Sequence, residues 1–165
     1  MNRFCIFAVL IGLTGCDLST AKPSVPPSTP PQELIDKDRI KVVPGPSDPD
    51  APQEFTTTES GLKYRILRRT DGKKPTAEDR VRVHYRGTFD DGKIFDTSYG
   101  KTGAAIEFPL NGVVKGWGEG LQLVGEGSMI ELEVPPELGY GKDGYPPMIP
   151  PNATLHFLVE LLNVK

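Results

Sequence analysis

The sequence predicts an α+β domain in which a curved antiparallel β-sheet wraps around one short α-helix. Three observations support this prediction. Apolar and polar residues alternate in four separate stretches, Asp-Gly pairs mark turns, and only one glycine-rich segment has helical character. Alternation gives each strand one apolar and one polar face, as expected for a sheet that buries a single side. The 165 residues allow one modest domain with additional segments.

The predicted strands are the four stretches in which apolar residues recur at every second position. The sequence DDGKIFD at residues 90–96 and the sequence TDGKKP at residues 70–75 carry the turn signals. The apolar positions are Leu62, Tyr64 and Ile66; Val81, Val83 and Tyr85; Ile130, Leu132 and Val134; and Leu155, Phe157, Val159 and Leu161.

The single predicted helix covers residues 114 to about 124 and contains the only tryptophan, Trp117, between Gly116 and Gly118. Glycine costs about 1 kcal/mol relative to alanine inside a helix. We therefore expect the helix to depend on packing against the sheet. Gly116 and Gly118 are predicted to let the chain turn tightly beneath the indole ring.

The N-terminal residues 1–15 are predicted to be a signal peptide, because Arg3 precedes an apolar run over residues 4–13 that is too short to span a bilayer. The sequence LTGC at residues 13–16 resembles the bacterial lipobox, in which the cysteine is lipidated and becomes the mature N-terminus. The resemblance implies a diacylglyceryl anchor on Cys16, and two acyl chains give stable membrane attachment. It implies a protein of the bacterial cell envelope, with the domain outside the cytoplasm, either periplasmic or on the cell surface.

Residues 16–53 are predicted to be a flexible linker. They are rich in proline and serine and poor in large apolar residues, so they cannot bury enough surface to form a core. Within this linker, residues 33–43 (ELIDKDRIKVV) fit a transient helix or a strand. The folded domain is predicted to cover residues 54–165.

Composition and spacing exclude several classes of function. The net charge of −3, with no basic cluster, argues against nucleic acid as a partner. His84 and His156 are the only histidines, and each lies in a predicted strand far from the other. We interpret both as structural and expect no metal and no cofactor.

A set of aromatic and apolar residues, interrupted by glycine and proline, remains as the candidate site. By themselves these residues fit an aromatic core better than a binding cleft. They are Tyr85, Phe95, Trp117, Tyr140, Tyr145 and Phe157, together with the sequence PPMIPP at residues 146–151.

Three ordered motifs favour the binding cleft over a plain aromatic core, because they resemble the FKBP-type peptidyl-prolyl cis-trans isomerase domain. They are VRVHYRGTFDDGKIFDTSY at 81–99, FPLNGVVKGWGEGLQLV at 108–124 and PPELGYGKDGYPPMIPPNATLHFLVELLNV at 135–164. The resemblance covers nearly all of residues 55–165. It implies that the protein isomerises X–Pro bonds in exported or envelope polypeptides without a cofactor. FPLN also resembles the bacterial branch that includes the macrophage infectivity potentiators.

The resemblance implies a role for each site residue. Trp117 forms the floor of a pocket, the Val114 N–H and the Tyr140 hydroxyl donate hydrogen bonds to the substrate, and Asp96 is the pocket carboxylate. The expected catalytic residues are Tyr85, Asp96, Val114, Tyr140 and Phe157; the expected substrate-binding residues are Phe95, Ile106, Val113, Trp117, Tyr145, Met148 and Ile149.

The sequence departs from the family pattern in four places. Tyr145 replaces a frequent histidine, Ile106 replaces a frequent phenylalanine, and the stretch between Phe108 and Val113 is short. No basic partner for Asp96 is evident near Lys101. Macrolides such as rapamycin, which the family often binds, are a further expected ligand class, and these departures bear on their affinity.

Isomerisation requires no covalent step, because the barrier is rotation about a planar amide, about 18–20 kcal/mol. A water-excluding apolar pocket that binds the twisted amide more tightly than the planar one lowers that barrier. Two alternatives remain. In the first, the protein is a peptide-binding module or holdase chaperone that uses the same cleft without turnover. In the second, it is a purely structural lipoprotein that binds no peptide.

Overall fold

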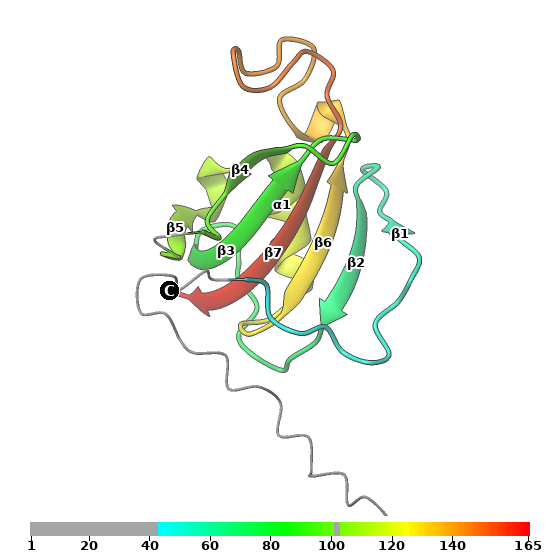
Figure 1. The fold of residues 1–165 in the computed structure, drawn as a ribbon. Coiled ribbons are helices and arrows are strands. Elements are labelled where there is room, and N and C mark those ends of the chain that lie inside the picture. The colour runs from blue at the N-terminus through cyan, green and yellow to red at the C-terminus, as the bar shows by residue number, and fades with distance from the viewer. Residues whose placement is uncertain (1–42, 101–102) are drawn as a thin grey trace, which may run out of the picture. The chain divides into compact units, whose positions relative to one another are not determined.

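The computed structural model describes residues 43–100 and 103–165, and every structural statement below refers to them (Figure 1). The predicted signal peptide, Cys16 and most of the segment 33–43 lie outside the described residues. None of the described helices is long and apolar enough to cross a membrane.

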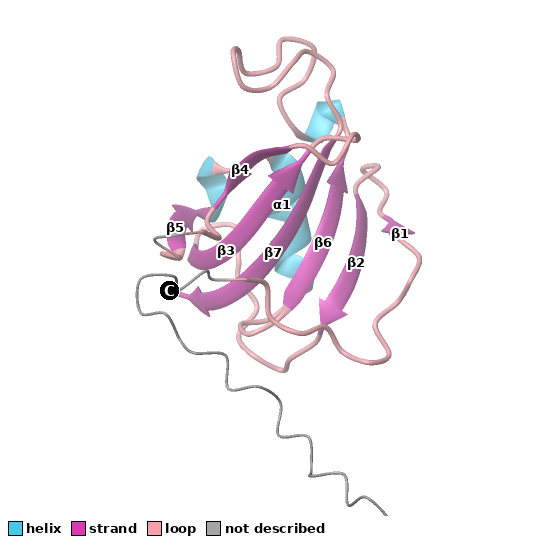
Figure 2. Cartoon of the chain, in the orientation of Figure 1, coloured by secondary structure: helices cyan, strands magenta, loops and turns pink. Residues whose placement is uncertain are grey.

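The fold is an antiparallel sheet of seven strands that packs on one short α-helix, which confirms the predicted fold class (Figure 2). The strand order is β1-β2-β6-β7-β3-β4, and β5 also pairs with β3. The strands are β1 (Thr56–Thr57), β2 (Lys63–Arg68), β3 (Arg80–Thr88), β4 (Ile94–Thr97), β5 (Ile106–Pro109), β6 (Met129–Val134) and β7 (Leu155–Val164). The helix α1 covers Lys115–Gly120, and 3-10 turns cover Leu110–Gly112, Leu121–Leu123 and Pro136–Leu138.

The core lies between the sheet and α1, on the side toward which the alternating apolar residues point. Val83, Leu132 and Val159 are fully buried there, whereas Tyr64 and Ile66 near the β2 edge are partly buried. The opposite face, called the outer face below, carries charged pairs between strands such as Lys63–Glu133, whose Nζ–Oε1 distance is 2.7 Å. The period-two pattern therefore predicted correctly which side chains of the four longest strands face the core.

The glycines of α1 act through close packing, not through the tight turn that the sequence predicted. A Cβ on Gly116 would lie 2.7 Å from Val134 Cγ1, and one on Gly120 would lie 2.6 Å from Leu132 Cδ2. A Cβ on Gly118 would meet nothing closer than 3.7 Å. Gly116 and Gly120 thus let the helix lie directly on β6, while Gly118 is not required for packing.

The sequence TDGKKP is part of a crossover connection and not of a hairpin, because β2 pairs with β6 and not with β3. A Cβ on Gly72 would lie 2.2 Å from the Glu126 carbonyl oxygen. Glu126 N–H also donates to Lys73 O at 2.9 Å. The glycine is needed where two loops cross. The other turn, at residues 89–93, is formed as predicted, with Gly92 at φ 79°.

Part of the predicted linker contacts the domain. The Asp48 N–H donates to Leu67 O at 2.7 Å, and the Asp48 carboxylate accepts from the Arg69 N–H at 2.8 Å. Gly45 N–H donates to Glu160 Oε1 at 2.9 Å. The boundary at residue 54 stays a prediction, but ordered contacts with the sheet begin at Gly45.

Candidate peptide-binding cleft

A cleft of about 390 Å³ lies between α1 and the core side of the sheet. Its lining comes from β3, β4, β5 and β7, from the start of α1 and from the loop after β6. The lining residues are Tyr85, Phe95, Asp96, Phe108, Gly112, Val113, Val114, Trp117, Tyr140 and Phe157.

Trp117 is the centre of the cleft's aromatic packing. Its indole lies edge-on to Tyr85, Phe108 and Phe157, with ring centroids 5.3, 5.8 and 5.3 Å away and interplanar angles above 80°. Such edge-to-face pairs add about 0.5–1.5 kcal/mol each beyond simple burial. The indole is 4% exposed, and its buried Nε1 has no hydrogen-bond partner in the described part of the chain. The rings around it hold the indole in a fixed orientation.

The one charged side chain in the cleft is Asp96, and Tyr85 orients it. The Tyr85 hydroxyl donates to Asp96 Oδ2 at 2.5 Å. Burial and this carboxylate raise the pKa of Tyr85 well above its usual value, so the hydroxyl stays protonated at neutral pH. The pair places an oriented carboxylate beside an otherwise apolar cavity.

Two hydrogen-bond donors at the cleft are not used internally. Within residues 43–100 and 103–165, no hydrogen bond engages the Val114 N–H, which precedes the first turn of α1. The Tyr140 hydroxyl likewise makes no hydrogen bond to the described residues, and Tyr140 is 39% exposed. Both groups are available to a ligand carbonyl.

Gly87 on β3 shapes one wall. A Cβ there would lie 2.5 Å from Phe95 Cζ and 3.1 Å from Phe157 Cε1. The β3–β4 register also shifts between Gly87 and Thr88. The missing side chain lets Phe95 and Phe157 pack edge-to-face, with centroids 5.6 Å apart, over the backbone of β3.

Eight of the predicted site residues line this cleft, and four do not. Ile106 is exposed at the start of β5, and Met148 is exposed in the loop before β7. Tyr145 is exposed but its ring lies 5.7 Å from that of Tyr140, while Ile149 is buried in the core at 3% exposure. The catalytic and binding roles of all twelve residues remain predictions.

Phe108 and Gly112 line the cleft but were not predicted as site residues. Phe108 lies on β5, which sequence reasoning did not identify as a strand. The signal was present, because Ile106 and Phe108 alternate with Glu107 and Pro109 in the period-two pattern of a strand.

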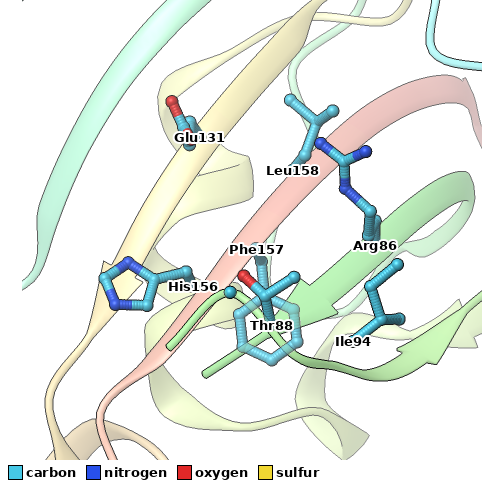
Figure 3. Close-up of a pocket in the computed structure, with 8 residues that line it drawn as sticks. Arg86, Thr88, Ile94, Glu131, His156, Phe157 and Leu158 are labelled. Atoms are coloured by element: carbon cyan, nitrogen blue, oxygen red, sulfur yellow. The ribbon is translucent and has the colours of Figure 1, made fainter. Parts of the chain in front are cut away.

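A second hollow of about 280 Å³ lies on the outer face, around the β3–β4 turn (Figure 3). It shares only Phe157 with the cleft, and its lining is mostly polar. Here His156 Nε2 lies 2.7 Å from Asp90 Oδ1 at the hairpin tip. The other histidine, His84, stacks on Tyr99 and contacts Ser98, so neither histidine reaches the cleft. The lining residues are Arg86, Thr88, Gly92, Ile94, Glu131, His156, Phe157 and Leu158.

The fold and the cleft together define a protein in which a sheet and one short helix enclose an aromatic binding site. Residues 71–162 match the family described as FKBP-type peptidyl-prolyl cis-trans isomerase. The chain belongs to this family, as its three motifs indicated.

Relatives and solved structures agree with the assignment. The FKBP-type 22 kDa peptidyl-prolyl cis-trans isomerase of Escherichia coli is 49% identical over 108 residues, which cover 66% of this chain and 52% of that protein. FkpA of Escherichia coli is 50% identical over 109 residues, covering 66% and 40%.

The crystal structure of the Escherichia coli FkpA superposes with a TM-score of 0.66 at 47% identity, covering 69% of this chain and 53% of that one. The crystal structure of AtFKBP13 gives a TM-score of 0.61 at 31% identity, covering 68% and 99%. The chain spans about half the length of the curated relatives it matches.

Proposed function

We propose that the protein is a peptidyl-prolyl cis-trans isomerase that acts on exported or envelope polypeptides. The observation that carries this proposal is the cleft itself, in which six aromatic residues line a cavity that offers two unused donors and one oriented carboxylate. A proline ring fits the aromatic floor, and an apolar cavity with few polar groups is typical of a small ligand site.

Catalysis in such a cleft depends on binding the twisted amide more tightly than the planar one. The planar amide is stabilised by charge-separated resonance, which water supports and which rotation abolishes. Trp117, Phe157 and Phe95 exclude water and so favour the twisted form. A hydrogen bond from the Val114 N–H or from Tyr140 adds about 0.5–1.5 kcal/mol.

The required acceleration is modest. Uncatalysed isomerisation takes tens of seconds or more. Reaching a median turnover of about 10 s⁻¹ needs about 3–4 kcal/mol of transition-state stabilisation. Desolvation and one or two hydrogen bonds are sufficient, with no change in the protonation of any side chain.

The substrate preference follows from the composition of the lining. Asp96 is its only charged residue and is already bonded to Tyr85, so the walls offer no partner for a charged side chain. We therefore expect peptides with Leu or Phe before proline to turn over faster than peptides with Glu or Lys. The reverse order would contradict this composition argument.

We further propose that the chain is a lipoprotein anchored through Cys16, with residues 1–15 removed as a signal peptide and residues 16–53 as the linker to the domain. The support is the LTGC sequence after a short apolar run. Mass spectrometry of the mature N-terminus should find an acylated Cys16, and Cys16→Ser should leave the chain unprocessed or unanchored. A different N-terminus without acyl mass contradicts the anchor.

Macrolide binding at the cleft is a parallel proposal, checked by a ligand-dependent rise in Tm.

The alternative function is a holdase that binds peptides in the same cleft without turnover. Refolding of a protein limited by proline isomerisation separates the two, because an isomerase accelerates the slow phase and a holdase slows it or leaves it unchanged. Acceleration at substoichiometric concentrations supports the proposal. A slow phase unaffected by equimolar protein contradicts it, and an absence of any titratable peptide binding favours a structural lipoprotein.

A further inference from the structure

Glu160 lies at the junction between the segment that precedes the domain and the strand that carries part of the cleft. It belongs to β7, and its neighbours Val159 and Leu161 are fully buried on the core side. The Glu160 side chain therefore points to the outer face, where it is only 7% exposed. It is one of three buried polar or charged residues in the described part of the chain.

The Glu160 carboxylate is bound by three donors from distant parts of the sequence. Oε1 accepts from the Gly45 N–H at 2.9 Å and from the Tyr99 hydroxyl at 2.7 Å, and Oε2 accepts from Arg68 Nη2 at 2.9 Å. A buried carboxylate is costly unless it is paired and hydrogen-bonded. Burial raises the pKa of Glu160, but these three bonds outweigh that effect and leave the pKa below its usual value. The carboxylate is thus charged, and both of its oxygens are hydrogen-bonded.

On one side, Glu160 holds the segment before β1. Besides the bond to Gly45, Arg68 Nη1 donates to Pro46 O at 3.2 Å, so the Arg68–Glu160 pair contacts two consecutive residues of this segment. Asp48 adds two hydrogen bonds, one to Leu67 of β2 and one to Arg69, which follows that strand. Residues 45–48 are therefore fixed to the outer face at several points.

On the other side, Glu160 binds Tyr99, the second residue after β4. The Tyr99 ring stacks on His84 of β3 at 5.3 Å and 24°. The adjacent Ser98 is buried, and its Oγ accepts from the Tyr85 N–H at 2.8 Å. Tyr99 and Ser98 together fix the end of β4 to β3.

The position of β4 determines the shape of the cleft. Within this four-residue strand, Phe95 forms a wall and Asp96 accepts the Tyr85 hydroxyl. A strand this short has few ladder bonds of its own, and a slip of one residue turns every side chain to the opposite face. The anchoring of Ser98 and Tyr99 therefore sets where Phe95 and Asp96 lie.

We propose that Glu160 is a positioning residue for the cleft: one oxygen of its carboxylate binds both the Gly45 amide and the Tyr99 hydroxyl, and so couples the segment before the domain to β4. The composition of the linker predicts that nothing before residue 54 affects the cleft. The hydrogen bond between Gly45 and Glu160 predicts instead that the segment before residue 54 affects the cleft. The kinetic part of this inference rests on the proposed isomerase function, whereas its structural part does not.

The first experiment compares Tyr99→Phe with Tyr64→Phe in the full chain. Tyr99→Phe removes one donor to Glu160 and keeps the ring that stacks on His84. Tyr64→Phe is the matched control, since its hydroxyl makes no hydrogen bond to the described residues. The readouts are the NMR amide resonances of Phe95 and Asp96, and kcat and KM for a Leu-Pro peptide. We expect shifted resonances and a KM raised about three- to tenfold in Tyr99→Phe only, the range expected for one hydrogen bond.

The second experiment tests the coupling from the linker side. Gly45→Pro removes the N–H that binds Glu160, and its added carbons also displace the Arg68–Glu160 pair, because a Cβ at this position would lie 2.6 Å from Arg68 Nη1 and 3.1 Å from Glu160 Oε2. It changes no residue of the cleft. It should shift the same Phe95 and Asp96 resonances. This shift should disappear when Gly45→Pro is combined with Glu160→Leu, which has no acceptor for Gly45 or Tyr99, because coupled residues act non-additively. Glu133→Leu, which removes another outer-face carboxylate, should leave these resonances unchanged.

Two results would overturn the proposal. One is that Tyr99→Phe and Gly45→Pro lower Tm but leave the Phe95 and Asp96 resonances and KM at wild-type values, which defines a purely structural role. The other is that Gly45→Pro shifts the Phe95 and Asp96 resonances by the same amount whether or not Glu160 is present. If Glu160→Leu does not fold, Tyr99→Phe and Gly45→Pro still decide the question. If the wild type shows no turnover, the proposed function fails while the resonance shifts continue to test the coupling.

Discussion

Tyr85 makes the shortest polar contact in the cleft, and its hydroxyl is the group whose removal isolates that contact. Tyr85→Phe keeps the ring that packs on Trp117 but leaves Asp96 without its donor. We expect kcat/KM to fall and the free energy of unfolding to drop by about 1.5–3 kcal/mol, the range for a hydrogen bond to a charged group. Urea unfolding and peptide kinetics measure both. Unchanged kcat/KM would show that the orientation of Asp96 does not matter to catalysis.

Trp117 contributes contact area and no acid–base chemistry. Trp117→Leu keeps an apolar floor but loses the three edge-to-face contacts. The variant should raise KM for a Leu-Pro peptide more than it lowers kcat. Isothermal titration of a non-isomerising proline ligand gives the binding part separately. A larger effect on kcat than on KM would assign the indole a role in the transition state.

At the residue scale, the cleft residues were predicted through the resemblance to the family motifs, which match where residues lie close together along the chain or alternate in long strands. Val113, Val114 and Trp117 lie within five positions, and Tyr85 and Phe157 follow the period-two pattern. Ile149 and Met148 lie in an irregular loop, where no period shows which side chain is buried. The unpredicted contact of Phe108 with Trp117 depends on a short strand whose pairing with β3 is a long-range property.

At the scale of the helix, the glycines of α1 provide an internally controlled test. Gly116→Ala would place a Cβ 2.7 Å from the stiff, buried Val134, so we expect a loss of about 1–3 kcal/mol from overpacking. Gly118→Ala has free space, and alanine is the better helix former by about 1 kcal/mol, so it should be neutral or stabilising. Chemical denaturation of both variants measures the difference. Equal effects would mean that propensity and not packing determines the choice of glycine.

Strand β5 is tied to the end of the chain by Glu107. Its carboxylate binds Lys165 Nζ at 2.6 Å and Arg80 Nε at 2.8 Å, and these bonds lower the pKa of Glu107 to about 2 from 4.5. A carboxyl whose pKa is lower in the folded than in the unfolded state stabilises the fold at pH values above its unfolded-state pKa. This stabilisation is lost as the pH falls through its folded-state pKa. The loss of stability between about pH 4.5 and 2 should therefore be smaller in Glu107→Gln than in the wild type. Parallel curves of Tm against pH would contradict this linkage.

The elements found from the sequence are the long strands, because each has several apolar residues in one period, and the helix, because it was the only segment with helical character. The two-residue β1 and the crossover at residues 69–79 have no such pattern. Gly72 shows why: the Asp-Gly pair is a local turn signal, but the glycine is required by the backbone of Glu126, which is remote in the sequence. Local chemistry indicated a turn, and only the fold reveals the crossing.

For the molecule as a whole, the mechanism makes a prediction about pH. No side chain has to change protonation, and neither histidine lies in the cleft. The value of kcat/KM should be nearly constant between about pH 6 and 8 and should survive EDTA, because a general-base histidine titrates in that window. A bell-shaped profile there, or activity abolished by chelation, would contradict catalysis by desolvation and fixed hydrogen bonds.

The central claim is that the cleft around Trp117 accelerates rotation about X–Pro bonds. NMR exchange spectroscopy on a Leu-Pro peptide with a catalytic amount of the full chain tests it most directly, because it observes both isomers at equilibrium. We predict cis–trans exchange much faster than in the peptide alone, and Phe157→Ala, provided that it folds, should remove most of the acceleration by opening the cleft to water. Peptide resonances that shift on binding while the exchange rate stays that of the free peptide would contradict the claim and identify a binding module.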